Sequence, residues 1–307
     1  MNKKYAVLFP GQGSQFIGMG KELAQNFDIA KQTFEEVDDT LNQKLSSLMF
    51  DGDIETLTQT QNAQPAIMAV SVATWRVLKT ESNIKGKVAC VAGHSLGEYS
   101  ALCASGTLNL NQTTKLLKVR ANAMHQATQK NAGGMLALLG ASIDQANELC
   151  EKSGCYVAND NCPGQIVLSG LLSNLTSAKI QAEQMGLKRV IPLAVSGAFH
   201  SPLMASAVEE LNQALQDAQF NTPEIPIYFN VLANVQNDAQ QFSDLLLKQL
   251  TQSVRWRETI QNIPCENFIE CGPGKVLSGL VKRTKDAVQI QDTNTLDNIK
   301  KILQAEQ

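Results

Sequence analysis

Residues 88–99 read VACVAGHSLGEY, and this stretch decides the fold. The apolar run 88–92 is typical of a strand buried on both faces of a parallel sheet. It leads directly into the pentapeptide GHSLG, and the residues that follow favour a helix. A strand, a Gly-x-Ser-x-Gly turn and a helix form a nucleophile elbow, which presents the serine hydroxyl at the edge of the sheet. We therefore predict that Ser95 is a nucleophile, the alternative being a serine that only caps the helix.

Strand-like and helix-like segments alternate on both sides of this elbow. A short apolar strand at 5–9 runs into a Gly-rich turn, and helix-like sequence follows to about residue 48 and again at 63–78. After residue 196 the alternation returns, with strands at 227–231 and 268–270, a helix near 275–283 and one more strand and helix at the end. This order predicts an α/β fold with a parallel sheet covered on both faces.

Between these two parts the elements become shorter. The strands are expected at 135–139, 156–159, 166–169 and 188–193, and the helices at 143–152 and 174–185. Their order, β-α-β-β-α-β, is the pattern of a small ferredoxin-like unit. We expect a discontinuous core of residues 1–130 and 197–307, interrupted by a ferredoxin-like subdomain at 131–196.

Composition narrows the class of protein. The formal net charge of -3 argues against a general nucleic-acid binder, which needs a basic face. No stretch reaches the roughly 20 apolar residues that a membrane span requires. The seven cysteines form no Cys-x-x-Cys pair, which favours reduced thiols in the cytoplasm and no metal site. We expect a cytoplasmic monomer whose partners are small molecules or individual proteins.

A serine nucleophile needs a base, and the chain has three histidines. His94 adjoins Ser95 and is expected to point away from it as a packing or hydrogen-bonding residue. His125 lies in a helix-like stretch and is expected to be a surface or structurally satisfied residue. His200 lies in a loop where the chain re-enters the core, and loops on rigid scaffolds carry catalytic groups. Elimination therefore favours His200 as the base.

Six short motifs occur in a specific order along nearly the whole chain. They are FPGQGSQ at 9–15, GHSLGE at 93–98, Arg120-x-x-x-Met124, Asn161-x-Pro-x-Gln165, GAFH at 197–200 and GPGK at 272–275. Together they resemble the malonyl-CoA:acyl-carrier-protein transacylase family, which is related to the acyltransferase domains of polyketide and fatty-acid synthases. The resemblance implies an α/β-hydrolase-like core with a ferredoxin-like insertion, in agreement with the element order above.

The resemblance also implies a reaction. Ser95 attacks the thioester of malonyl-CoA while His200 takes its proton, and the phosphopantetheine thiol of acyl-carrier protein then attacks the malonyl-serine ester in a ping-pong cycle. Coenzyme A thioester and carrier protein are substrates, and no cofactor is bound permanently. The backbone N–H groups of Gln12 and Leu96 stabilise the oxyanion, and the backbone carbonyl of Arg255 orients His200. The expected lining residues are Met124, Asn161, Gln165 and Phe199.

Arg120 is the residue that specifies the acyl group. Without the resemblance, an arginine in the sequence KLLKVR at 115–120 indicates a solvated helix face. The resemblance instead implies that the guanidinium binds the malonyl carboxylate through two parallel hydrogen bonds. Phe199 before the base, and Leu96 after the nucleophile, disfavour a methyl-branched malonyl group.

Three other functions stay open at this stage. The same transfer can serve a polyketide synthase instead of fatty-acid synthesis, a serine hydrolase or thioesterase shares the elbow and the base, and a non-catalytic acyl-binding module is the third. Acyl-carrier proteins are acidic, so the docking surface is expected to be basic. A candidate cluster near the GPGK motif comprises Lys275, Lys282, Arg283 and Lys285.

Overall fold

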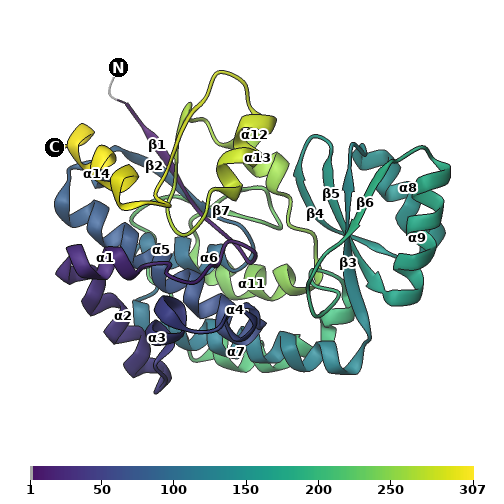
Figure 1. Cartoon of the computed structure of the whole chain (residues 1–307), viewed down its shortest axis with the longest axis horizontal. Helices are drawn as coiled ribbons and strands as arrows, with labels where there is room; N and C mark the ends of the chain where they lie inside the picture. The colour runs from purple at the N-terminus through teal and green to yellow at the C-terminus, as the bar shows by residue number, and fades with distance from the viewer. Residues whose placement is uncertain (1–2) are drawn as a thin grey trace.

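The computed structural model describes residues 3–307, which form a large α/β unit with a smaller unit at its side (Figure 1). A six-stranded sheet in the order β10-β9-β1-β2-β7-β8 lies at the centre of the large unit. All neighbouring pairs are parallel except β7 and β8. The strands are β1 (Tyr5–Phe9), β2 (Val88–Gly93), β7 (Ile227–Phe229), β8 (Asn234–Gln236), β9 (Asn267–Glu270) and β10 (Gln289–Asp292). The predicted parallel sheet is confirmed, and the short β8 is an addition to it.

The central strand β1 is buried on both faces because its side chains alternate between two cores. Tyr5, Val7 and Phe9 pack into the larger core with α2, α5, α6 and α7, whereas Ala6 and Leu8 pack under α12 and α13 on the other face. The helices are α1 (Lys21–Asn26), α2 (Asp28–Leu41), α3 (Leu45–Asp51), α4 (Ile54–Thr58), α5 (Thr60–Glu81), α6 (Gly97–Ala104), α7 (Leu110–Lys130), α10 (Val208–Gln216), α11 (Phe242–Thr251), α12 (Trp256–Asn262), α13 (Val276–Thr284) and α14 (Leu296–Ala305).

The smaller unit is an antiparallel sheet in the order β4-β5-β3-β6, with α8 and α9 on its outer face (Figure 1). Its elements are β3 (Gly133–Leu139), α8 (Ile143–Ser153), β4 (Tyr156–Cys162), β5 (Gln165–Leu171), α9 (Leu172–Gln184) and β6 (Arg189–Pro192). The predicted β-α-β-β-α-β order is confirmed. Along β3, Leu136 and Leu138 pack under the two helices, while Met135 and Ala137 pack on the side of the large unit.

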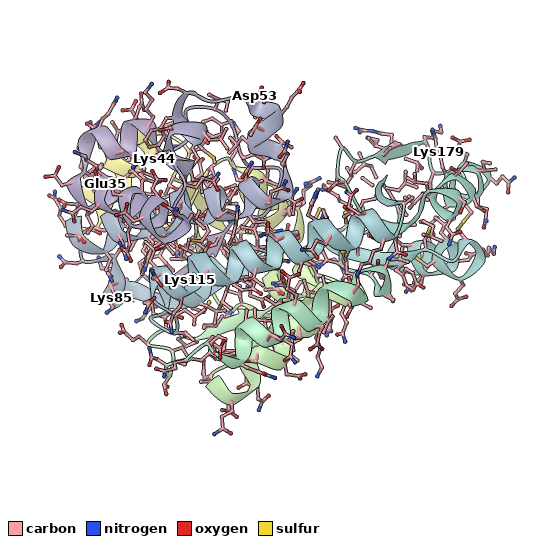
Figure 2. All side chains as sticks on the ribbon, turned by 90° about the horizontal axis from the view of Figure 1, so that it is seen from below. Glu35, Lys44, Asp53, Lys85, Lys115 and Lys179 are labelled. Carbon is pink, nitrogen blue, oxygen red and sulfur yellow. The ribbon has the colours of Figure 1, made fainter. Side chains whose placement is uncertain are left out.

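Several connections join the small unit to the large one. Helix α7, which carries Lys115, crosses beneath the large unit and leads directly into β3 (Figure 2). Asn159 of strand β4 forms a parallel bridge with Val254. Arg257 on α12 forms an ion pair with Asp160 and donates to both of its carboxylate oxygens. The space between the two units is therefore built from both sides.

The outer faces carry charges of both signs. Glu35, Lys44, Asp53, Lys85, Lys115 and Lys179 are all exposed and project away from the ribbon (Figure 2). Among residues 3–307, none of the helices combines the length and the apolar character that crossing a membrane requires.

Candidate active site

The elbow after β2 has the strained geometry that its sequence predicts. Ser95 has a φ of 53°, in the left-handed region that residues other than glycine rarely adopt. A Cβ on Gly93 would lie 1.9 Å from the backbone carbon of Gly97, and a Cβ on Gly97 would lie 2.2 Å from the carbonyl oxygen of Phe9. The Gly-x-Ser-x-Gly spacing is therefore a steric requirement, because β1, β2 and α6 approach each other too closely for any side chain there.

Ser95 and His200 form a hydrogen-bonded pair. The Oγ of Ser95 lies 2.8 Å from Nε2 of His200, and the other ring nitrogen, Nδ1, lies 2.8 Å from the backbone carbonyl oxygen of Gln249. A carbonyl can only accept, so Nδ1 carries the proton and Nε2 is left to accept one from the serine hydroxyl. This is the arrangement that a general base requires.

His200 is neutral in this structure. Burial lowers its pKa to about 3, with the nearby positive charge of Arg120 as the second cause, and only 4% of the residue is exposed. At neutral pH the ring therefore keeps a lone pair available for the Ser95 proton.

Arg120 is the second group that contacts the nucleophile. It comes from α7, is 1% exposed, and donates to Gln64 Oε1 at 2.5 Å, to Gln249 Oε1 at 3.0 Å and to Ser95 Oγ at 3.1 Å. All three acceptors are neutral. Burial lowers the pKa of Arg120, but a guanidinium stays charged in proteins, so the site contains a buried cation next to the nucleophile.

These groups open into one cavity of ≈ 330 Å³ between the two units. Its lining includes Ser95, His200 and Arg120, and six further predicted site residues, Gln12, Leu96, Met124, Asn161, Gln165 and Phe199, whereas the predicted Arg255 is not among the lining residues. Within residues 3–307, the backbone N–H groups of Gln12 and Leu96 donate to no protein acceptor. Both remain available to a ligand oxygen in the cavity.

Comparison with known proteins places this geometry in a family. The family model described as "Acyl transferase domain" matches residues 7–304. The chain belongs to the acyl transferase domain family. It is 43% identical to the malonyl CoA-acyl carrier protein transacylase of Bacillus subtilis, over 96% of this chain and 95% of that protein.

Solved structures agree with the membership. The acyl-carrier-protein-S-malonyltransferase of Bartonella henselae superposes with a TM-score of 0.95 at 44% identity, covering 98% of this chain and 99% of that one. A malonyl-transacylase solved in complex with a type II PKS acyl-carrier protein superposes with a TM-score of 0.94 at 34% identity, covering 99% of this chain and 100% of that one.

One predicted contact of this acyl transferase is wrong. The carbonyl that accepts from His200 belongs to Gln249, not to Arg255. Arg255 directly precedes α12, and its carbonyl accepts from the N–H and the hydroxyl of Thr259 in the first turn of that helix. Gln249 lies in the last turn of α11, where backbone carbonyls have no partner within the helix, so its carbonyl is available to the imidazole.

The other two histidines match their predicted character. His94 Nε2 lies 2.8 Å from Asn161 Oδ1, and its ring packs edge-on against Trp256 at 5.3 Å between centroids. His125 is half-buried on α7, outside the cavity lining.

Four buried polar residues behind the site were not predicted, namely Gln64, Glu98, Asn230 and Gln249. Each is at most 1% exposed, and together they bond to the elbow and to Arg120. A signal for Gln249 exists in the sequence. It falls on the buried stripe of α11, formed with Phe242, Leu245, Leu246 and Leu250, where a glutamine is out of place unless it has partners.

Proposed function

We propose that this acyl transferase moves a malonyl group from malonyl-CoA to the phosphopantetheine thiol of acyl-carrier protein, through a malonyl ester of Ser95. The observation that carries the proposal is the position of Ser95 Oγ, 2.8 Å from His200 Nε2 and 3.1 Å from Arg120 Nη2 in one cavity. A base and a buried cation that both contact the nucleophile suit an acyl group that carries a carboxylate.

In the first half-reaction, the Ser95 hydroxyl gives its proton to His200 Nε2 while its oxygen attacks the thioester carbonyl carbon of malonyl-CoA. The carbonyl oxygen becomes an oxyanion, for which the free N–H groups of Gln12 and Leu96 are suitable donors. Leu96 directly precedes α6, so the positive end of that helix favours the same charge. One such donor typically contributes about 3 kcal/mol of transition-state stabilisation.

The intermediate then collapses by breaking the carbon–sulfur bond. Coenzyme A leaves as a thiolate that takes the proton back from His200, and the malonyl group remains on Ser95. In the second half-reaction the phosphopantetheine thiol gives its proton to His200 and its sulfur attacks the ester. Collapse of this second intermediate returns the proton to the Ser95 oxygen and releases malonyl-carrier protein.

The carbonyl of Gln249 supports both steps. It accepts from Nδ1–H of His200, and this bond strengthens when the ring becomes an imidazolium. The carboxylate of a bound malonyl group also offsets the charge of Arg120, which weakens the second-largest cause that lowers the pKa of His200, after burial.

We further propose the domain division that the sequence suggested. Residues 1–130 and 197–307 form an α/β-hydrolase-like core, and residues 131–196 form an inserted ferredoxin-like subdomain. The strand order β4-β5-β3-β6, with both helices on one face, supports the second assignment. The seven cysteines are free thiols, which supports a cytoplasmic location.

Fatty-acid synthesis is the proposed destination of the malonyl group. A second candidate is supply of a polyketide synthase, favoured by the similarity to the transacylase solved with a type II PKS carrier protein. For docking, Lys275, Lys282 and Arg283 are exposed, whereas Lys285 donates to the carbonyl of Ile263. Relative rates with carrier proteins of the two pathways separate the two candidates.

Mass spectrometry after mixing the protein with malonyl-CoA tests the proposal. We expect one malonyl adduct, confined to the peptide that contains Ser95 and discharged by adding holo acyl-carrier protein. The Ser95→Ala variant is the control and forms no adduct. Hydrolysis that rivals transfer in the presence of carrier protein would show a serine hydrolase instead.

A further inference from the structure

Within the part of the chain that the structure describes, the cation beside the nucleophile has no direct counter-ion. Every acceptor of Arg120 is a neutral oxygen, and among residues 3–307 no carboxylate forms a salt bridge with it. An isolated charge at 1% exposure is costly, so a compensating charge is expected close by.

The nearest candidate is Glu98, one turn past the elbow on α6 and also 1% exposed. One of its oxygens accepts from the backbone N–H of Asn230 at 2.9 Å, and the other accepts from the side-chain amide of Gln249. The same amide accepts from Arg120 through its oxygen at 3.0 Å. A single carboxamide thus connects the buried carboxylate to the buried guanidinium.

The remaining ionisable groups around this pair carry no charge. His200 is neutral, and burial raises the pKa of Tyr99, the neighbour of Glu98 on α6, so its phenol stays protonated. Within residues 3–307, the hydrogen-bond partners of the Glu98 carboxyl are the side-chain amide of Gln249 on α11 and the backbone N–H of Asn230 after β7. Arg120, and Glu98 at a pH near or above 8 where it ionises, are therefore the two groups whose charges determine the electrostatics of the site before a substrate binds.

We propose that Glu98 is a positioning residue that, when ionised, balances the charge of Arg120 through Gln249 before a substrate binds, and gives up that role when a substrate carboxylate binds. The inference rests on the proposed function, because it requires an acyl group with a carboxylate. Once that carboxylate pairs with Arg120, an ionised Glu98 is a second buried anion at one cation, and it takes up a proton.

Linkage fixes the direction of the effect. Burial raises the pKa of Glu98 to about 8, opposed by the Asn230 N–H and by Arg120, and a nearby carboxylate raises it further. Binding of malonyl-CoA therefore takes up protons near pH 8. By the same linkage, the affinity for malonyl-CoA falls as the pH rises above about 8, by at most about tenfold per pH unit.

The test is isothermal titration calorimetry of malonyl-CoA into the Ser95→Ala variant, which binds without reacting, at pH 8 in two buffers of different ionisation enthalpy. We expect uptake of about half a proton per malonyl-CoA. Acetyl-CoA, which has the same nucleotide and pantetheine but no carboxylate, is the matched ligand and takes up none. Equal uptake with the two ligands would overturn the proposal.

A pair of variants identifies the group that takes up the proton. Glu98→Gln in the Ser95→Ala background abolishes the uptake, whereas Glu270→Gln, at a buried glutamate that instead caps α13, leaves it unchanged. Uptake that persists in Glu98→Gln contradicts the proposal. If Glu98→Gln does not fold, the comparison of proton uptake with malonyl-CoA and with acetyl-CoA still tests the proposal. Failure of the wild-type protein to form a malonyl adduct on Ser95 contradicts the proposed function instead.

Discussion

Asn230 holds Ser95 in place: its Oδ1 accepts from the Ser95 N–H at 2.8 Å, while its Nδ2 donates to the carbonyl of Gly93 at 2.7 Å. One side chain thus joins both ends of the elbow. In Asn230→Ala both backbone groups lose a buried partner, at about 1–3 kcal/mol each. We expect the free energy of unfolding to fall by about 3 kcal/mol in urea titrations, and kcat for malonyl transfer to fall at least about 100-fold.

Asn221→Ala is the control for that variant. Asn221 is exposed, and its amide makes one long contact, at 3.5 Å, to the carbonyl of Gly106. Its loss is expected to change stability by less than about 0.5 kcal/mol and to leave kcat unaltered. A wild-type kcat in Asn230→Ala would show that the elbow keeps its shape without the bridge.

A second prediction concerns the glycine that follows the nucleophile. In Gly97→Ala the new methyl group meets the Phe9 carbonyl oxygen at 2.2 Å, and neither backbone can move freely within the sheet. We expect a loss of about 2 kcal/mol or more in the free energy of unfolding, together with loss of malonyl-adduct formation.

Gly279→Ala is the matched substitution. Gly279 lies inside α13, and a Cβ there meets no atom within 4 Å. Alanine should therefore stabilise the protein by about 0.5–1 kcal/mol. If both glycine variants lose similar stability, the close approach of β1 and α6 is not the cause.

The sequence predicts the parts of this site that lie in contiguous motifs. The elbow is contiguous along the chain, and the structure gives a steric reason for both of its glycines. His200 follows from elimination among three histidines, whereas Arg120 follows only from the family resemblance, because its local sequence indicates a solvated helix face. Short apolar runs followed by turn residues likewise suffice to predict β1 and β2, and the succession of strand-like and helix-like segments predicts the order of elements in the small unit.

The parts that could not be predicted depend on tertiary contacts. Which carbonyl orients His200 depends on where α11 ends, and helix ends are the least certain feature of a sequence-based assignment. Glu98, Asn230 and Gln249 come from three distant segments, and each alone is an unremarkable polar residue. Only their common burial behind the elbow indicates a role.

A third prediction follows from the neutral base. An ordinary histidine titrates near 6.5, whereas burial and Arg120 hold the pKa of His200 at about 3. Between these values the unfolded chain binds a proton that the folded protein does not, so stability falls as the pH is lowered through this window, by at most about 1.4 kcal/mol per pH unit. Urea titrations at pH 6.5 and pH 5 measure the loss. In His200→Gln this contribution is absent, and an equal loss in both proteins would exclude His200 as its source.

The fourth prediction concerns the choice of acyl group. In Arg120→Ala the malonyl carboxylate loses its cation, and removing one partner of a buried charge pair costs about 3–5 kcal/mol. We expect kcat/KM for malonyl-CoA to fall by at least about 100-fold. The kcat/KM for acetyl-CoA should fall far less, because an acetyl group has no carboxylate to pair with the cation. The malonyl-to-acetyl ratio of kcat/KM is the measurement, and an unchanged ratio would remove Arg120 from the substrate site.

Arg120→Lys separates charge from geometry at the same position. Lysine keeps a positive charge but cannot reproduce the planar fork that donates to Gln64, Gln249 and Ser95 at once, so we expect malonyl preference to be only partly retained. The charge also acts on the base, since Arg120 is the second cause that lowers the pKa of His200. In the alanine variant that pKa rises, and the acid limb of kcat/KM for acetyl-CoA moves to higher pH. In the lysine variant, which keeps a cation near the ring, the limb moves less; equal shifts in both variants would mean that lost packing, not lost charge, changes the base.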